Sequence, residues 1–190
     1  MVNRSVHIMN EQSLDLLGRY GMVLARLIIG YLWFDQLDWK MPPTFGCPPG
    51  FPVSTGPDAR TGGLCDWSGL VAVYSMIPAH ATLFREFINP NIWWIGWVVW
   101  ILEALTATSL ILGLLSRLGA FLGLVQAINL FIGLAAAPFE WPWSYGQLVT
   151  LQLIFFCIPP GRTLGLDAWL RSRFAATKDS RLARILNWVT

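Results

Sequence analysis

Charged residues are scarce in this 190-residue chain: only 13% are Asp, Glu, Lys or Arg, while 55% are apolar. Soluble domains normally carry about 25% charged residues. The low charge, the eleven tryptophans and a positive mean hydropathy exclude an ordinary water-soluble domain. The composition indicates an integral membrane protein in contact with the lipid bilayer, and no nucleic-acid partner is expected.

Motifs for intrinsic cofactors are absent as well. The sequence contains no dinucleotide fingerprint, no haem motif, no iron–sulfur spacing and no C-x-x-C pair. Its two histidines, His7 and His80, are predicted to lie on opposite sides of the membrane and therefore cannot ligate one metal. We expect no intrinsic haem, flavin or metal centre.

Four stretches are predicted to cross a bilayer as helices, for which about 20 mostly apolar residues are needed. They are residues 14–37, 92–115, 118–138 and the shorter 145–158. We therefore predict an all-α membrane protein with a single integral membrane domain over residues 1–190. It is a four-transmembrane-helix bundle with a long outer loop at 38–91 and a cytoplasmic tail at 161–190.

The distribution of basic residues predicts the topology. The polar start of the chain shows no removable signal, so the first span should itself direct insertion. Nine of the thirteen Lys and Arg lie on the side of the termini, and only Lys40, Arg60 and Arg85 lie on the other. The positive-inside rule then places both termini in the cytoplasm and residues 38–91 outside the cell's inner (plasma) membrane.

Most tryptophans lie near the outer ends of the spans. There they are expected to form an aromatic belt that anchors the helices at the headgroups. A stack of rings lining the entry of a flat hydrophobic ligand is the alternative use of the same residues.

The outer loop is rich in Pro and Gly and carries Cys47 and Cys65. A disulfide between these residues would staple the loop and contribute about 3 kcal/mol in the chain-entropy model. The alternative is a pair that cycles between thiol and disulfide. Cys157, near the inner end of the fourth span, is interpreted as a small buried hydrophobe.

Three shorter helices are predicted outside the spans. Residues 67–76 and 79–88 are too short to cross the membrane, so we expect interfacial helices that cover the outer mouth of the bundle. Apolar residues at helical spacing over 182–189, with Arg181 and Arg184 beside them, predict a C-terminal amphipathic helix on the inner leaflet or on a partner subunit.

Glu103 lies inside the second predicted span. A carboxylate at that depth costs several kcal/mol unless it is paired, so such residues usually mark a site. The structural alternative is an ion pair with Arg26 of the first span that only holds helices together. The two residues are separated by roughly 10 Å in height when each residue rises ~1.5 Å, a gap that Gln126 or Asn129 would bridge.

A set of polar and aromatic residues is expected to accompany Glu103. Asp35 and Glu140 are embedded among aromatic residues, where a site and a solvated charge are equally compatible with the sequence. Asp38 and Lys40 are interpreted as ordinary solvated charges. The predicted catalytic residues are Glu103 and Arg26, and the predicted quinone- or substrate-binding residues are Gln126, Asn129, Asp35, Trp33, Trp100 and Glu140.

Several segments together resemble the DoxX-like family, and within it the DoxD-type small subunits of thiosulfate:quinone oxidoreductase. They are ARLIIGYLWFDQLDWKMPP, LEALTATSLILGLLSRLGA, FEWPWSY and PPGRTLGLDAWL. The most distinctive positions are Arg26, Glu103 and the PGR…LD pattern formed by Pro160, Gly161, Arg162, Leu166 and Asp167.

The resemblance implies a membrane subunit that works with a second subunit to oxidise thiosulfate outside and pass electrons to membrane quinone. Any redox cofactor would then come from the partner or be the quinone itself. The alternative is a non-catalytic accessory subunit packed against a larger respiratory or photosynthetic complex. A small transporter is a third hypothesis, which the absence of visible inverted repeats disfavours.

Overall fold

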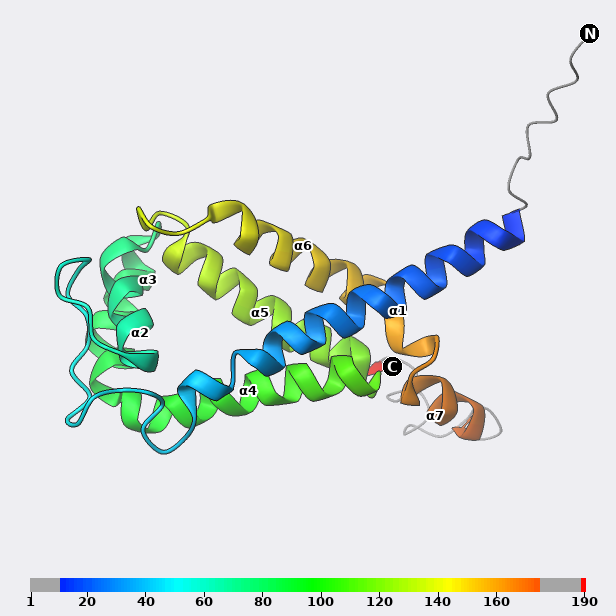
Figure 1. The fold of residues 1–190 in the computed structure, drawn as a ribbon, viewed down its shortest axis with the longest axis horizontal. Helices are drawn as coiled ribbons and strands as arrows, with labels where there is room; N and C mark the ends of the chain where they lie inside the picture. Colours follow the sequence, from blue (N-terminus) through cyan, green and yellow to red (C-terminus); the bar gives the residue numbers. More distant parts are fainter. Residues whose placement is uncertain (1–10, 175–188) are drawn as a thin grey trace, which may run out of the picture.

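The computed structural model describes residues 11–174 and 189–190, and this part of the chain is helical without any strand (Figure 1). Four long helices run along the molecule: α1 (Glu11–Asp35), α4 (Ile92–Leu112), α5 (Ser116–Leu134) and α6 (Pro142–Cys157). The prediction of an all-helical chain is confirmed. The shorter elements are η1 (Asp38–Lys40), α2 (Gly63–Tyr74), α3 (Pro78–Leu83), η2 (Phe84–Ile88), η3 (Asn89–Asn91), η4 (Pro160–Arg162) and α7 (Leu166–Phe174).

Three helical stretches within the described residues are long and apolar enough to cross a membrane: Glu11–Lys40, Pro78–Leu112 and Ser116–Leu134. They contain most of the first three predicted spans and define the chain as an all-helical membrane protein. Helix α6 has 16 residues, fewer than a typical span needs. The fourth span and the membrane topology therefore stay predictions.

The long helices pack in chain order, with α1 on α4, α4 on α5 and α5 on α6. Glycines of α5 permit the close approach that the G-x-x-x-G spacing predicts. A Cβ atom at Gly119 would fall 2.1 Å from Oγ of Ser109 on α4, and one at Gly123 would fall 2.4 Å from Nε2 of Gln152 on α6. Gly119 therefore allows α4 to approach α5 closely, and Gly123 does the same for α6.

The core between the four long helices is formed by Ile29, Trp33, Ala107, Leu110, Ala120 and Phe155.

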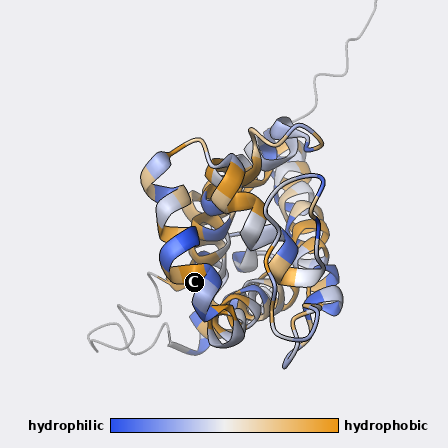
Figure 2. Ribbon diagram, turned by 90° about the vertical axis from the view of Figure 1, so that its left-hand side faces the viewer, coloured by the Kyte–Doolittle hydropathy of each residue, from blue (hydrophilic) through white to orange (hydrophobic). Residues whose placement is uncertain are grey.

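Helices α2 and α3 lie together at one end of the bundle, here called the loop end (Figure 1). The chain runs from α3 through η2 and turns at η3 into the direction of α4, where Pro90 cannot donate a backbone hydrogen bond. Helix α2 packs on α4 and α5. Figure 2 faces this end, with the strongly hydrophobic long helices behind its loops. The structure therefore contains helices at both predicted short segments, with shifted bounds.

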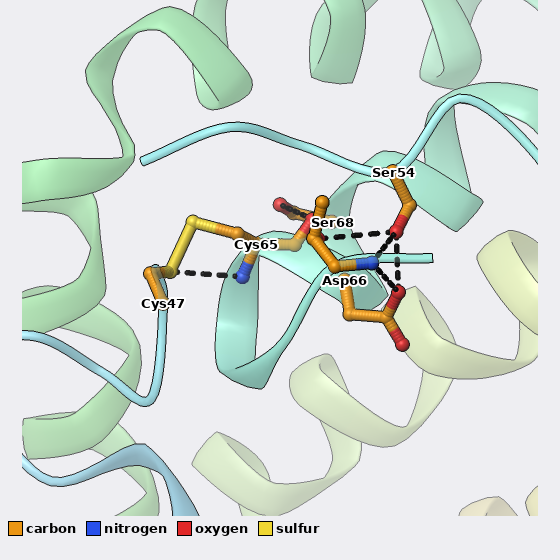
Figure 3. Close-up of a disulfide and its surroundings, with 6 residues drawn as sticks. Cys47, Ser54, Cys65, Asp66 and Ser68 are labelled. Carbon is orange, nitrogen blue, oxygen red and sulfur yellow. Dashed lines mark hydrogen bonds between the residues drawn. A yellow bond between two sulfur atoms is a disulfide. The ribbon is translucent and has the colours of Figure 1, made fainter. Parts of the chain in front are cut away.

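The loop between α1 and α2 is stapled to the bundle. Cys47 and Cys65 form a disulfide, and the backbone N–H of Cys65 lies 3.1 Å from Sγ of Cys47 (Figure 3). The fully buried ring of Phe45 packs on Gly96 of α4, where a Cβ atom would fall 2.6 Å from the ring. The ring also makes a T-shaped contact with the ring of Trp97, at a centroid distance of 5.9 Å. The loop is thus fixed against α4 on one side and α2 on the other.

Asp66 on α2 organises the rest of this loop. Its carboxylate accepts hydrogen bonds from the Ser54 hydroxyl (Figure 3), from Nε of Arg60 at 2.9 and 2.8 Å, and from the backbone N–H of Thr61 at 3.0 Å. Burial alone would raise the pKa of Asp66, but the hydrogen bonds from Arg60, Ser54 and Thr61 outweigh it and lower the pKa below its ordinary value.

Asp66 is expected to make the loop sensitive to acid. A lowered pKa means that the carboxylate stabilises the fold above the ordinary pKa of about 3.9, and that this contribution is lost as the pH falls through the folded-state pKa. Replacement Asp66→Asn should lower stability at pH 7 by about 1–3 kcal/mol and flatten its loss in acid. Thermal unfolding between pH 7 and about pH 2 measures the stability at pH 7 and its loss in acid.

The control is Asp58→Asn, at an exposed position of the same loop, which should change neither the stability at pH 7 nor its loss in acid. Equal acid sensitivity of wild type and Asp66→Asn would contradict the prediction.

Helix α7 lies at the opposite end of the bundle, here called the tail end (Figure 1). It begins with Leu166 and Asp167, the last two residues of the PGR…LD pattern, and was not predicted from the sequence. The predicted C-terminal amphipathic helix over 182–189 falls almost entirely outside the described residues. Cys157 is exposed on α6, which corrects its interpretation as a buried residue, because it faces away from the neighbouring helix.

Candidate functional site

Glu103 is paired with a lysine from the loop rather than with an arginine from a span. Nζ of Lys40 lies 2.5 Å from Oε2 of Glu103, and each residue is only 5% exposed. The ammonium group also lies 4.5 Å from the ring centroid of Trp39. Two predictions are therefore wrong: Lys40 is not a solvated charge, and Arg26 is not the partner of Glu103.

The path of the chain explains this pairing. Helix α1 ends at Asp35, and the 3-10 turn η1 at the end of the stretch Glu11–Lys40 places Lys40 in a buried position beside Glu103 of α4. An estimate of depth in the membrane that adds ~1.5 Å per residue along straight helices does not account for such a turn. The sequence signal was the lone cation of this segment, in a Trp-Lys pair just before the Pro-rich loop.

The ion pair lies in the wall of a cavity of about 610 Å³ between the helices. This volume is within the usual range for small-molecule sites, which are mostly apolar with few polar groups. Side chains of α1, α2, α4, α5 and α6 contribute to the wall, together with η1 and η2. The apolar wall includes Ile29, Val71, Phe84, Ile95, Val99, Leu130 and Leu148.

Two amide side chains of α5 line the same cavity, as the prediction for Gln126 and Asn129 requires. Nε2 of Gln126 donates to Oγ1 of Thr106 at 3.4 Å and to the Leu122 carbonyl at 3.5 Å. Its amide hydrogens are therefore used, and its oxygen remains as an acceptor. Oδ1 of Asn129 accepts a hydrogen bond from Nε2 of His80 at 2.9 Å.

Trp33 also lines the cavity, and its buried indole N–H has no hydrogen-bond partner among the described residues. Gln152, which follows the lining residue Leu151, is fully buried with both amide atoms likewise unpartnered. Buried polar groups are normally hydrogen-bonded, and an unpaired one calls for a ligand, water or function. Trp33 therefore gives the cavity wall a free hydrogen-bond donor, whereas the amide of Gln152 lies against Gly123 of α5 and does not line the cavity.

The remaining predicted binding residues lie away from the cavity wall. Asp35 is exposed at the end of α1, and Trp100 of α4 is not a lining residue. Glu140 accepts a hydrogen bond from the hydroxyl of Tyr145 at 2.6 Å, and Tyr145 is the residue that lines the cavity. Depth along a helix does not show which way a side chain points around it, so the depth estimate grouped Asp35 with the cavity-lining Trp33.

Arg26 lies at the tail end, where it belongs to a separate cluster. Its Nη2 donates to the Leu164 carbonyl at 3.3 Å, and the side chain is 2% exposed. The carboxylate of Asp167 accepts hydrogen bonds from the backbone N–H groups of Leu115 at 2.6 Å and Ser116 at 2.9 Å. This cluster joins α1, the α4–α5 turn and α7, so Arg26 and Glu103 do not form one site.

Glycines shape this cluster. Gly113 has a positive φ of 61° and Leu115 has one of 50°, a tight turn in which a Cβ atom at Gly113 would collide with the Arg26 guanidinium. The backbone N–H of Asp167 donates to the Gly113 carbonyl at 2.8 Å. The PGR…LD pattern therefore has a structural role in the described chain, closing the tail end around Arg26.

Comparison with known proteins does not identify a family or a function for this chain. No family model matches the chain, and no curated protein and no solved structure is similar to it. In residues 11–174 and 189–190, no three His, Cys, Asp or Glu side chains are grouped to hold a metal ion. The chain is an all-helical membrane protein whose largely apolar cavity carries a buried ion pair.

Proposed function

We propose that this protein is the membrane subunit of a quinone-linked oxidoreductase of the thiosulfate:quinone type, in which the cavity binds the quinone head group. The observation that carries the proposal is the Lys40–Glu103 ion pair in the wall of a mostly apolar cavity. A quinone is a flat, apolar ring with two oxygens that need polar partners. Few other ligands dissolved in a bilayer combine these properties.

In this proposal some cavity residues would contact the quinone ring, and others would form hydrogen bonds with its oxygens. Apolar side chains such as Val99 and Leu130 would contact the ring, while Gln126, Asn129 and the indole of Trp33 would supply hydrogen bonds. In this proposal the loop end faces outside the inner membrane and both termini are cytoplasmic, as the distribution of basic residues predicts. The quinone then binds near the side on which thiosulfate is oxidised.

The chemistry requires two electrons and two protons for each quinone. Joining two thiosulfate ions through a new S–S bond releases two electrons, which a second subunit would pass to the quinone. As negative charge develops on a quinone oxygen, the ammonium group of Lys40 would stabilise it. Glu103, beside Lys40, would transfer protons between the cavity and the outside.

Thiosulfate-dependent reduction of a quinone analogue by gently solubilised membranes tests this proposal. Replacement Glu103→Gln is expected to lower the rate at least about 100-fold, the usual contribution of an acid–base group. The rate is to be normalised to folded protein. Glu86→Gln removes an exposed carboxylate of η2 away from the cavity and should leave the rate unchanged.

Two results would overturn the proposal in different ways. An unchanged rate and pH dependence in Glu103→Gln would remove Glu103 from the mechanism. No thiosulfate-dependent activity in wild-type membranes, together with co-purification of a large respiratory or photosynthetic complex, would identify an accessory subunit instead.

A further inference from the structure

His80 connects the outer short helices to the cavity wall. Its Nδ1 lies 2.8 Å from the hydroxyl of Ser75, and its Nε2 lies 2.9 Å from Oδ1 of Asn129. The ring also lies 4.9 Å from that of Phe84. Asn129 and Phe84 both line the cavity, so the imidazole lies directly behind one part of its wall.

The chemistry of these groups fixes the orientation of the Asn129 amide. Oδ1 of an amide can only accept, so the bond from His80 requires the proton to be on Nε2. The NH2 group of Asn129 is then left as a donor. We propose that Asn129 donates a hydrogen bond to a carbonyl oxygen of the cavity ligand, and that His80 is the positioning residue that holds the amide in this orientation. This inference rests on the proposed quinone site and names the contact that recognises the carbonyl.

Ser75 allows this orientation in both charge states of His80. When Nδ1 is unprotonated, it accepts from the Ser75 hydroxyl. When Nδ1 is protonated, it donates to Ser75, whose hydroxyl can then donate to the carbonyls of Ile77 at 3.3 Å or Ile132 at 3.4 Å. In either state Nε2 carries its proton and the Asn129 amide keeps its direction.

Charged neighbours do not disturb this chain of hydrogen bonds. Helix α3 packs on α2, η2 and α5. Within the described residues His80 forms no ion pair with a charged group of these elements, and Arg85 of η2 donates to the Ala72 carbonyl at 3.1 Å. The other titratable or charged groups on these elements are Asp66 and Tyr74 of α2, Glu86 of η2 and Arg117 at the far end of α5.

Gln126 complements Asn129 one turn earlier on the same helix. Since Gln126 uses its amide hydrogens on Thr106 and Leu122, it offers an acceptor where Asn129 offers a donor. Residues three apart on a helix lie about 5–6 Å from each other. The α5 wall thus presents a hydrogen-bond donor at Asn129 and an acceptor at Gln126, so an oxygen of the ligand that carries no proton is bound at Asn129 rather than at Gln126.

The orientation can be tested without any ligand. Nitrogen NMR of histidine-labelled, full-length protein at alkaline pH reports which ring nitrogen of neutral His80 carries the proton. The chain has only two histidines, so His7→Gln assigns the signals. We expect protonated Nε2. A neutral His80 protonated on Nδ1 would overturn the inference, because Asn129 would then have to donate to the ring.

The ligand contact is tested with a short-chain benzoquinone carrying labelled ring carbonyls. Infrared spectra of the wild-type complex should contain a carbonyl band lowered in frequency by the hydrogen bond. Asn129→Leu should lose this shift and bind the quinone up to about tenfold more weakly. His80→Leu should lose the shift as well, whereas His80→Gln should restore it, since a glutamine N–H can donate to Oδ1 of Asn129.

The outcomes separate this inference from the proposed function. If wild type binds the benzoquinone but Asn129→Leu keeps the same carbonyl band and affinity, the inference is overturned and the quinone site stands. If wild type shows no saturable binding, the quinone site is overturned, and with it the assignment of a carbonyl to Asn129.

Discussion

Replacement of Glu103 by glutamine is expected to destabilise the protein by about 3–5 kcal/mol, the range for breaking a buried ion pair from one side. The ammonium group of Lys40 would remain buried against α4, 5% exposed and without its counter-charge. Lys40→Met should have a similar effect because it leaves the Glu103 carboxylate unpaired. Thermal and denaturant unfolding in one fixed detergent measures both changes.

The double replacement Lys40→Met/Glu103→Leu provides the matched control. Removing both charges and filling the space with apolar side chains is often neutral or stabilising. The double variant should therefore be clearly more stable than either single variant while lacking quinone reduction. Single variants as stable as wild type would show that water reaches the pair, contrary to its burial.

The second large effect is expected at Asp167, in the cluster at the tail end. Asp167→Ala removes the acceptor of the Leu115 and Ser116 backbone N–H groups and a negative charge that interacts with Arg26. Each buried group left unsatisfied costs about 1–3 kcal/mol, so a total loss of at least about 3 kcal/mol is expected. Asp167→Asn should lose less, because its amide oxygen still accepts one hydrogen bond. The free energy of unfolding in detergent measures these changes.

Coupling to Arg26 distinguishes this cluster from a simple helix cap. Because the charges of Arg26 and Asp167 interact electrostatically, the double variant Arg26→Met/Asp167→Ala should lose clearly less stability than the sum of the two single variants. Arg171→Gln, on the same helix α7, should be nearly neutral. Additive losses for the pair would mean that the two side chains act independently.

Features that depend on composition and periodicity could be predicted from the sequence. The apolar runs predicted all four long helices, and three of these lie in stretches with the length and apolarity that a bilayer demands. The pairing of Cys47 with Cys65 followed from their being the two cysteines of one loop. The choice of Glu103, Gln126 and Asn129 followed from the energetic cost of polar groups within apolar spans.

Features that depend on tertiary turns could not be predicted in the same way. Lys40 is brought to Glu103 by a single 3-10 turn, and a short polar segment carries no signal that distinguishes folding inward from solvation. Arg26 donates to the Leu164 carbonyl and lies beside Gly113 and Gly165, and no pattern in the sequence predicts contacts with backbone atoms and glycines. The contact of His80 with Asn129 joins residues from elements far apart in the chain, so only the folded structure brings them together.

The two charges of the cavity belong to different kinds of segment. Lys40 opens the stapled loop, whereas Glu103 belongs to a membrane helix. Exchange of the loop between related proteins would therefore add or remove a charge within the cavity without altering any long helix. Because a single unpaired charge at either position would be destabilising, a loop that lacks the Lys40 ammonium would be compatible with this cavity only if Glu103 were replaced as well.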